Sequence, residues 1–214
     1  MKSAVRIWGD EMQLDKTLRH TLIEVMASTI DAHWHELTQL DQAIGDGDHG
    51  AGMKRGFDAV LAHADKLAEL PLPAALTGIG RTLVMSMGGA SGPLYGTFFL
   101  ELGKTLGEEP DREVFNAAFA RAMAAVAARG KSELGQKTLL DVLGPVSDAL
   151  SEGADAGSVS RVAADAAEAT VPMQAFRGRA SFLGERSIGH MDPGARSASL
   201  LIGAVSTVLE NASK

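Results

Sequence analysis

Cysteine is absent from the 214-residue chain, which excludes disulfides, thiolate metal sites, iron–sulfur clusters and thiol nucleophiles. Aromatic residues make up only 5%, and 27 acidic residues outnumber 20 basic ones, which argues against a general nucleic-acid-binding protein. Long apolar runs are missing too: the longest, residues 199–209, is about half the length that crosses a bilayer. The first ten residues contain no apolar segment of a secretory signal. We therefore expect a cytoplasmic protein that binds neither membranes nor nucleic acid, with one domain over residues 1–214.

Alternation of apolar and polar residues, the pattern of a half-buried strand, does not extend beyond a few residues anywhere. Apolar residues instead recur at intervals of three and four, which is typical of amphipathic helices. We predict an all-α fold of about eight helices, with Asp111 as one N-cap and with Trp34 and Phe57 in the core. The helices are expected over residues 11–40, 53–67, 72–87, 94–102, 111–126, 139–150, 159–170 and 195–211.

The connections between these helices are of two kinds. Plain turns are expected at residues 68–73, 107–110 and 152–157. Connections rich in glycine and polar residues are expected at residues 45–52, 88–96, 130–138 and 177–194. In an up-and-down bundle the two kinds tend to fall at opposite ends, which predicts a functional site at the glycine-rich end.

The most informative segment is the acidic glycine loop that follows the first predicted helix. Asp46 and Asp48 are separated by one glycine, and Asp41 precedes them at the helix end, where a carboxylate faces the negative end of the helix dipole. Three converging carboxylates need a neutralising cation, and hard oxygen ligands suit magnesium or calcium. The spacing is not that of an EF-hand. A hydrophilic turn without a ligand is the alternative that this segment alone leaves open.

Two apparent nucleotide motifs lack their usual structural context. Residues 45–50 fit the glycine pattern of dinucleotide-binding folds, but they follow a predicted helix, and two aspartates would oppose a pyrophosphate. Residues 130–138 resemble a Walker loop with one residue too many before the lysine, and again no strand precedes them. Neither motif is therefore taken as evidence for its usual fold.

Residues 88–96 join two predicted helices and read Gly-Gly-Ala-Ser-Gly-Pro-Leu-Tyr-Gly. Free backbone N–H groups, the Ser91 hydroxyl and the absence of side chains suit a cradle for phosphate oxygens, although a tight connection with glycines for packing is the alternative. Lys137, Arg179 and Arg186 on other loops could offset the charge of a triphosphate. An acidic metal loop, a phosphate cradle and cations are together the parts that phosphoryl transfer requires.

These segments together resemble the nucleotide-binding L subunit of dihydroxyacetone kinase. The resemblance rests on motifs that occur in order along most of the chain, at residues 40–50, 53–57, 88–99, 137–142 and 178–195. It implies a barrel of eight antiparallel helices that holds an adenine nucleotide (ADP or ATP) and two magnesium ions in the loops at one end. One departure is Gly52, which stands where the family commonly has asparagine, so that a side-chain contact there would be lost.

The resemblance also implies roles for particular residues. The metal ligands and catalytic carboxylates would be Asp41, Asp46 and Asp48, and His49 would polarise a phosphoryl oxygen, with a structural role as the alternative. The phosphates would lie along His49, Gly50, Ala51, Gly52, Ala90 and Ser91. The base and ribose would lie beside Gly130 and Leu139. Arg179, Asp192, Pro193 and Gly194 would close over the nucleotide.

The resemblance further implies that the sugar is held elsewhere. In this family a separate K subunit binds dihydroxyacetone covalently on a histidine, and at 214 residues we expect no room for that domain in this chain. The phosphoryl donor would be either a phosphotransferase-system phosphohistidine protein, which recharges ADP in place, or ATP from solution. Another small ketose such as erythrulose, and a nucleotide-dependent interaction with a transcription regulator, are alternatives. The number of copies stays open, with a homodimer as one arrangement.

Overall fold

The computed structural model of the protein describes residues 14–212, and this part of the chain is helical without a strand, which confirms the predicted all-α class. The α-helices are α1 (Lys16–Ile44), α2 (His49–Leu61), α3 (Ala64–Glu69), α4 (Leu72–Ser86), α5 (Ser91–Thr105), α6 (Arg112–Gly130), α7 (Leu140–Ser151), α8 (Ala156–Glu168) and α9 (Pro193–Ala212). A 3-10 segment, η1 (Arg179–Ser187), lies between α8 and α9.

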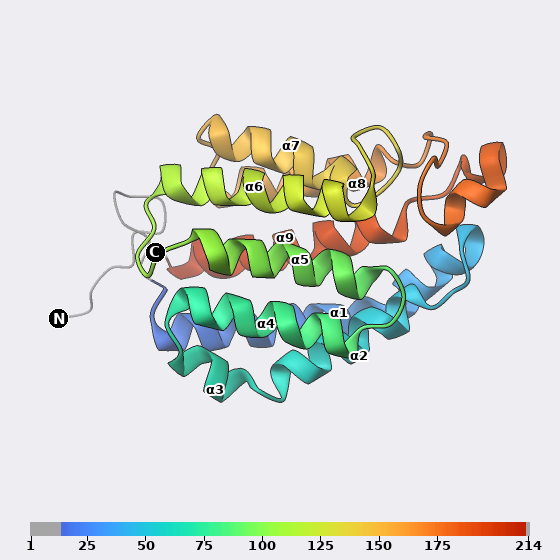
Figure 1. Ribbon diagram of the computed structural model, residues 1–214. Coiled ribbons are helices and arrows are strands. Elements are labelled where there is room, and N and C mark those ends of the chain that lie inside the picture. Colours follow the sequence, from blue (N-terminus) through green and yellow to red (C-terminus); the bar gives the residue numbers. More distant parts are fainter. Residues whose placement is uncertain (1–13, 213–214) are drawn as a thin grey trace.

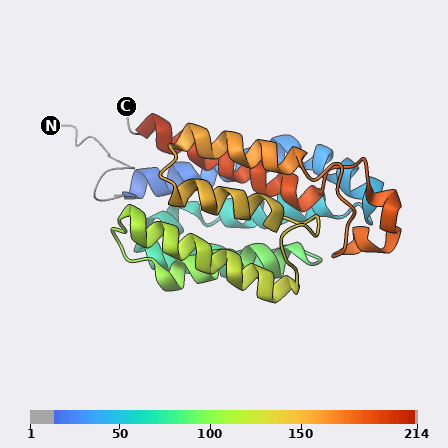
Figure 2. The same ribbon diagram turned by 90° about the horizontal axis from the view of Figure 1, so that it is seen from above.

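The long helices lie side by side with nearly parallel axes, and the chain reverses direction between them (Figure 1). The glycine-rich connections and η1 gather at one end, on the right of Figure 1, and the view from above in Figure 2 places η1 at that same end. The plain turns lie at the other end. The predicted separation of the two kinds of connection is thus confirmed, and four helices, α2, α5, α7 and α9, begin at the glycine-rich end.

Aspartate side chains fix where several helices begin. Asp15, Asp111 and Asp155 are N-caps that accept hydrogen bonds from backbone N–H groups three residues later, at 2.7–2.8 Å. The Asp111 cap was predicted; the Asp155 cap starts α8 three residues earlier than its apolar spacing indicates. The predicted helix over residues 53–67 is in fact two helices, α2 and α3, because the chain leaves helical geometry at His63. The first predicted helix began at residue 11, which lies outside the described residues.

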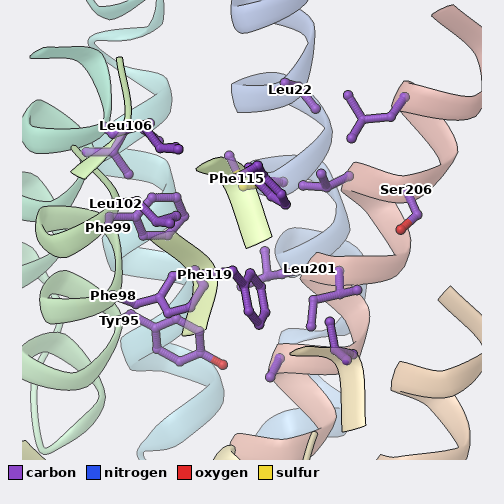
Figure 3. A pocket seen from close by; sticks show the side chains of 18 of the residues that line it. Leu22, Tyr95, Phe98, Phe99, Leu102, Leu106, Phe115, Phe119, Leu201 and Ser206 are labelled. Carbon is purple, nitrogen blue, oxygen red and sulfur yellow. The ribbon is translucent and has the colours of Figure 1, made fainter. Parts of the chain in front are cut away.

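Buried apolar side chains from all nine α-helices of the described residues, α1 to α9, form one large core cluster. Phe57 is fully buried as predicted, whereas Trp34 is only half-buried and stacks on His35 with ring centroids 3.5 Å apart. An apolar cavity of about 220 Å³ lies between the helices, lined by aromatic and aliphatic side chains such as Phe98, Phe119 and Leu201 (Figure 3). No helix among residues 14–212 is long and apolar enough to span a bilayer.

Candidate functional site

Three carboxylates meet where α1 ends and α2 begins. Asp41, Asp46 and Asp48 each place an oxygen so that the three oxygens lie within 4.8 Å of one another, as the sequence predicts. Asp41 is buried in the last turn of α1, whereas Asp46 and Asp48 are exposed. Like charges at this spacing repel by roughly 1–3 kcal/mol per pair, depending on exposure to water. A cluster of hard oxygen donors, open on one side, therefore fits a magnesium-type cation.

The glycines of this loop let the carboxylates converge. A Cβ atom on Gly45 would lie 2.1 Å from Oδ1 of Asp41, so only glycine lets the Asp41 side chain fold back over the helix end. Gly47 has φ +76°, in the left-handed region that favours glycine. The backbone N–H of His49 then donates to Oδ2 of Asp41 at 3.1 Å, which ties the start of α2 to the end of α1.

Residues 87–91, the serine–glycine turn, connect α4 to α5 and lie directly against this cluster. A Cβ on Gly89 would lie 3.6 Å from Oδ2 of Asp48, and one on Gly52 would lie 3.9 Å from the carbonyl oxygen of Gly88. Ala90 is exposed at the end of this turn, and Ser91 is the first residue of α5. The structure thus brings together the acidic loop and the serine–glycine turn, two segments that the sequence predicts to share a site.

His49 is enclosed beneath the same turn. Its Nδ1 lies 2.9 Å from Oγ of Ser91, and its Nε2 lies 2.9 Å from Oγ of Ser197 on α9. Burial lowers the pKa of His49 to about 4, which the nearby carboxylate of Asp48 only partly opposes. The imidazole is therefore neutral near pH 7, and both ring nitrogens are engaged within the protein.

Gly50 and Ala51, which follow His49 in the first turn of α2, differ in their surroundings. A Cβ on Gly50 would lie 2.0 Å from the carbonyl oxygen of Trp34 and 2.3 Å from Oγ1 of Thr38. Gly50 is therefore required for the close approach of α2 to α1, a role that the phosphate-binding motif does not reveal. Ala51 is partly buried.

The start of α9 packs against the loop between α6 and α7. A Cβ on Gly194 would lie 3.6 Å from the backbone nitrogen of Leu139, so Leu139 and the segment Asp192–Gly194 lie side by side. Oδ2 of Asp192 accepts a hydrogen bond from the backbone N–H of Ala195 at 2.7 Å. Burial, together with the nearby carboxylate of Asp141, raises the pKa of Asp192 to about 7, although the hydrogen bond from Ala195 opposes the shift.

Gly130 ends α6 on the other side of the same loop. A Cβ on Gly130 would lie 3.3 Å from a methyl carbon of Leu94, which is in the first turn of α5. Gly130 is therefore placed beside the first turn of α5.

Two of the basic side chains expected to offset phosphate charge, Arg179 and Lys137, contact other groups of the protein. Nε of Arg179 pairs with Oδ2 of Asp46 at 2.8 Å, so η1 reaches the acidic loop. Lys137 does not face the site: it is 1% exposed, and its Nζ donates to the carbonyl oxygens of Met173 and Ser187 at 2.9 and 2.7 Å. The interpretation of Lys137 as a phosphate-facing cation is therefore not supported by its geometry.

Sequence reasoning did not single out several residues that organise the site. Asp141 accepts hydrogen bonds from the backbone N–H groups of Gly135 and Thr138 and so shapes the loop between α6 and α7. Tyr95 and Ser197 are bonded to one another at 2.7 Å behind His49. Asp141 and Tyr95 belong to motifs of the resemblance without a role of their own there, whereas Ser197 has only the pattern of a core position in an amphipathic helix.

The chain is similar to proteins of one family. The sequence model of the DAK2 domain matches residues 43–207. The ADP-binding subunit DhaL of the PEP-dependent dihydroxyacetone kinase of Escherichia coli (strain K12) is 42% identical over 171 residues, which cover 75% of this chain and 81% of that subunit. The corresponding subunit of the PEP-dependent dihydroxyacetone kinase 1 of Listeria innocua is 44% identical over 174 residues, covering 79% of this chain and 84% of that subunit.

The fold is also found in a solved structure. The dihydroxyacetone kinase of C. freundii in complex with AMP-PNP and Mg2+ superposes with a TM-score of 0.71 and 25% sequence identity. The superposition covers 89% of this chain but only 34% of that kinase, so the chain spans about a third of the length of the C. freundii protein.

Proposed function

The chain belongs to the DAK2 domain family, and on that premise we propose that it is the nucleotide-binding subunit of a dihydroxyacetone kinase. In this proposal the glycine-rich end holds an adenine nucleotide with two magnesium ions. The terminal phosphoryl group passes to dihydroxyacetone carried by a separate K subunit. The observation that carries the proposal is the convergence of three carboxylates, within 4.8 Å of one another, on the turn that leads to Ser91.

Helix starts support the placement of the phosphates. α2, α5 and α9 begin at His49, Ser91 and Pro193, and all three starts lie at the glycine-rich end. The first turn of a helix carries unpaired N–H groups and the positive end of the helix dipole, both of which favour phosphate oxygens. The phosphates would lie along His49 to Gly52 and Ala90–Ser91, with Arg179 and Asp192–Gly194 closing over the nucleotide and Leu139 and Gly130 beside the base and ribose.

Asp41, Asp46 and Asp48 would hold the magnesium ions. Magnesium held by these carboxylates would supply positive charge that offsets the charge of the phosphates and the charge that develops during transfer. The protein's own contribution is to fix the carboxylates, the Ser91 hydroxyl and the helix N–H groups before the nucleotide arrives, so that little reorganisation remains. His49 is assigned a role in orienting Ser91, because its ring nitrogens are both occupied by hydroxyl groups.

The phosphoryl donor is proposed to be a phosphotransferase-system phosphohistidine protein that recharges ADP in place. Direct use of ATP is the alternative, and another ketose such as erythrulose is the alternative acceptor, since the sugar would be bound by the partner. The residues of this chain do not determine the phosphoryl donor or the sugar acceptor. They are decided by what the purified protein contains and by which partners complete the reaction.

The first experiment is to purify the protein without added nucleotide, denature it, and identify what is released. Stoichiometric ADP with magnesium supports a coenzyme that is recharged in place. A nucleotide-free protein that binds ATP reversibly supports direct ATP use. A protein that contains no nucleotide and binds none contradicts the proposal.

A matched pair of variants tests the metal site. Asp46→Asn should weaken magnesium and ADP binding together, because the carboxylate is proposed to hold the ion that bridges to the nucleotide. Asp58→Asn removes an exposed carboxylate of α2 that pairs with Lys54, outside the cluster, and should leave both affinities unchanged. Unchanged ADP affinity in Asp46→Asn, measured by calorimetry with and without magnesium, would count against the metal account.

A further inference from the structure

Four polar side chains form a buried chain from the serine–glycine turn into the wall of the apolar cavity. Ser91 Oγ is bonded to His49 Nδ1 at 2.9 Å, and His49 Nε2 is bonded to Ser197 Oγ at 2.9 Å. Ser197 Oγ is bonded in turn to the Tyr95 hydroxyl at 2.7 Å. The carbonyl oxygen of Gly194 lies 3.1 Å from Ser197 Oγ and 3.4 Å from the Tyr95 hydroxyl.

Tyr95 and Ser197 are themselves enclosed. Tyr95 is 6% exposed and Ser197 is fully buried. The Tyr95 ring lines the apolar cavity, and Figure 3 shows its hydroxyl directed away from α5. A hydroxyl group in such a wall costs free energy unless it is hydrogen-bonded. Since phenylalanine would pack equally well there, the hydroxyl of Tyr95 is explained by its bond to Ser197 rather than by packing.

Counting protons leaves two arrangements for this chain. Each hydroxyl donates one proton, and a neutral imidazole donates from one nitrogen and accepts at the other. In the first arrangement Nε2–H donates to Ser197, Ser197 donates to the Gly194 carbonyl, Tyr95 donates to Ser197 or to that same carbonyl, and Ser91 donates to Nδ1. In the second, Tyr95 donates to Ser197, Ser197 donates to Nε2, and Nδ1–H donates to Ser91.

Only the second arrangement leaves the Ser91 proton free for another acceptor. A phosphate oxygen is an acceptor, so a nucleotide phosphate at Ser91 requires a donated proton from that hydroxyl. We propose that Tyr95 and Ser197 are positioning residues for the nucleotide phosphate, acting through the Nδ1–H tautomer of His49 to turn the Ser91 hydroxyl outward. This inference rests on the proposed function, because it requires a phosphate at Ser91.

Calorimetry with Mg·ADP on the nucleotide-free protein tests the affinity. Tyr95→Phe and Ser197→Ala should each weaken binding roughly three- to tenfold, the range expected for one lost hydrogen bond. Ser199→Ala is the matched control, since Ser199 is also a buried serine of α9 whose hydroxyl donates to the carbonyl three residues earlier, but it lies outside the chain. Ser199→Ala should bind like the wild type. Equal affinities for the wild type, Tyr95→Phe and Ser197→Ala would overturn the inference.

A double-mutant cycle separates positioning from a general structural role. In a Ser91→Ala background the outward donor is already gone, so Tyr95→Phe should have little further effect on Mg·ADP affinity. If Tyr95→Phe weakens binding by its full factor in that background, its hydroxyl does not act through Ser91, and the inference is wrong.

Nitrogen NMR of 15N-histidine-labelled protein gives a readout that general stability does not move. Addition of Mg·ADP should increase the Nδ1–H tautomer of His49 in the wild type, with the resonance assigned by its loss in His49→Gln. An Nε2–H tautomer in the Mg·ADP complex would overturn the inference. Failure of the wild type to bind Mg·ADP at all would instead contradict the proposed function, so the two failures are distinguishable.

Discussion

Nε of Arg179 lies 2.8 Å from Oδ2 of Asp46, so a residue of η1 closes onto a loop more than 130 positions earlier in the chain. Both side chains remain partly open to water, at 68% and 38% exposure, so the pair itself adds little to stability. The pair matters instead because it places a positive charge beside a proposed metal ligand. Arg179 and the proposed metal ions would compete for the same carboxylate of Asp46, and Arg179 is also proposed to close over the nucleotide.

This double position gives effects of opposite sign for Arg179→Ala. Magnesium should bind the nucleotide-free variant up to about fivefold more tightly, because a competitor for Asp46 is removed. ADP should bind more weakly, because a cation beside the phosphates is lost. Titration calorimetry with magnesium alone and then with ADP measures both. Arg186→Ala, in the same segment, is the control, and equal shifts in both variants would show a general charge effect instead.

The two glycines of α2 should respond differently to alanine. Gly50→Ala places a Cβ 2.0 Å from the Trp34 carbonyl oxygen, whereas Gly52→Ala meets nothing closer than 3.8 Å. Urea unfolding should show Gly50→Ala destabilised by more than about 2 kcal/mol through overpacking. Gly52→Ala should be neutral or more stable by up to about 1 kcal/mol, since alanine is the better helix former. Similar losses in both variants would contradict the packing account of Gly50.

The apolar spacing predicts most of this fold because each long helix buries one side. The end of the bundle that carries the site is also predictable, because the connections expected there are longer than the plain turns and combine several glycines with charged and hydroxyl side chains. The helix α3 and the segment η1 were missed. α3 has only six residues, too few for a clear periodicity, and η1 is interrupted at Gly184, whose φ is +57°.

The candidate site was predictable where a residue's chemistry is visible in a short motif, as for Asp41, Asp46 and Asp48. Contacts between distant segments were not. The sequence favours Lys137 as a cation that offsets phosphate charge, because nothing in it reveals the carbonyl groups of Val171, Met173 and Ser187 that surround the amine. The resemblance places Gly50 along the phosphates, but it does not reveal the tight contact of Gly50 with α1, because that contact depends on how two helices cross. The partnership of His49 with Ser197 likewise joins residues 148 positions apart.

Glu36 should make stability depend on pH in the acidic range. Burial raises the pKa of Glu36, but hydrogen bonds from Arg196 and His33 and the charge of Arg196 outweigh it, so the pKa lies below its ordinary value. Because the pKa is lowered, the ion pair of Glu36 with Arg196 stabilises the folded protein at pH values above the ordinary glutamate pKa of about 4.3. This contribution to the free energy of unfolding disappears as the pH falls through the folded-state pKa. Because the Glu36 side chain is 39% exposed and solvent screens the pair, the contribution is at most about 1 kcal/mol.

Comparison of the wild type with Glu36→Gln measures this contribution. The difference in free energy of unfolding should be constant from about pH 7 to pH 5 and should shrink below about pH 4. Glu109→Gln, at an exposed position of the turn between α5 and α6, should show no such difference. A difference that grows on acidification has the wrong sign and would exclude the ion pair as its source.

Lys137 should be the most sensitive lysine of the loop between α6 and α7. It and Lys131 both have positive φ, at 61° and 50°, so backbone strain does not distinguish them. Lys131 is exposed, whereas the buried Lys137 amine joins the carbonyl oxygens of Val171, Met173 and Ser187 and so ties the segment before α9 to this loop. Lys137→Met keeps the length of the side chain but leaves these carbonyl groups without their donor, which should lower the free energy of unfolding in urea by about 2–4 kcal/mol.

ADP binding to Lys137→Met should weaken as well, because residues 179–194 lose the hydrogen bonds that hold them. Lys131→Met should change neither stability nor ADP binding. Full stability in Lys137→Met would mean that water replaces the amine, and that the hydrogen bonds of Lys137 do not hold the segment before α9 in place.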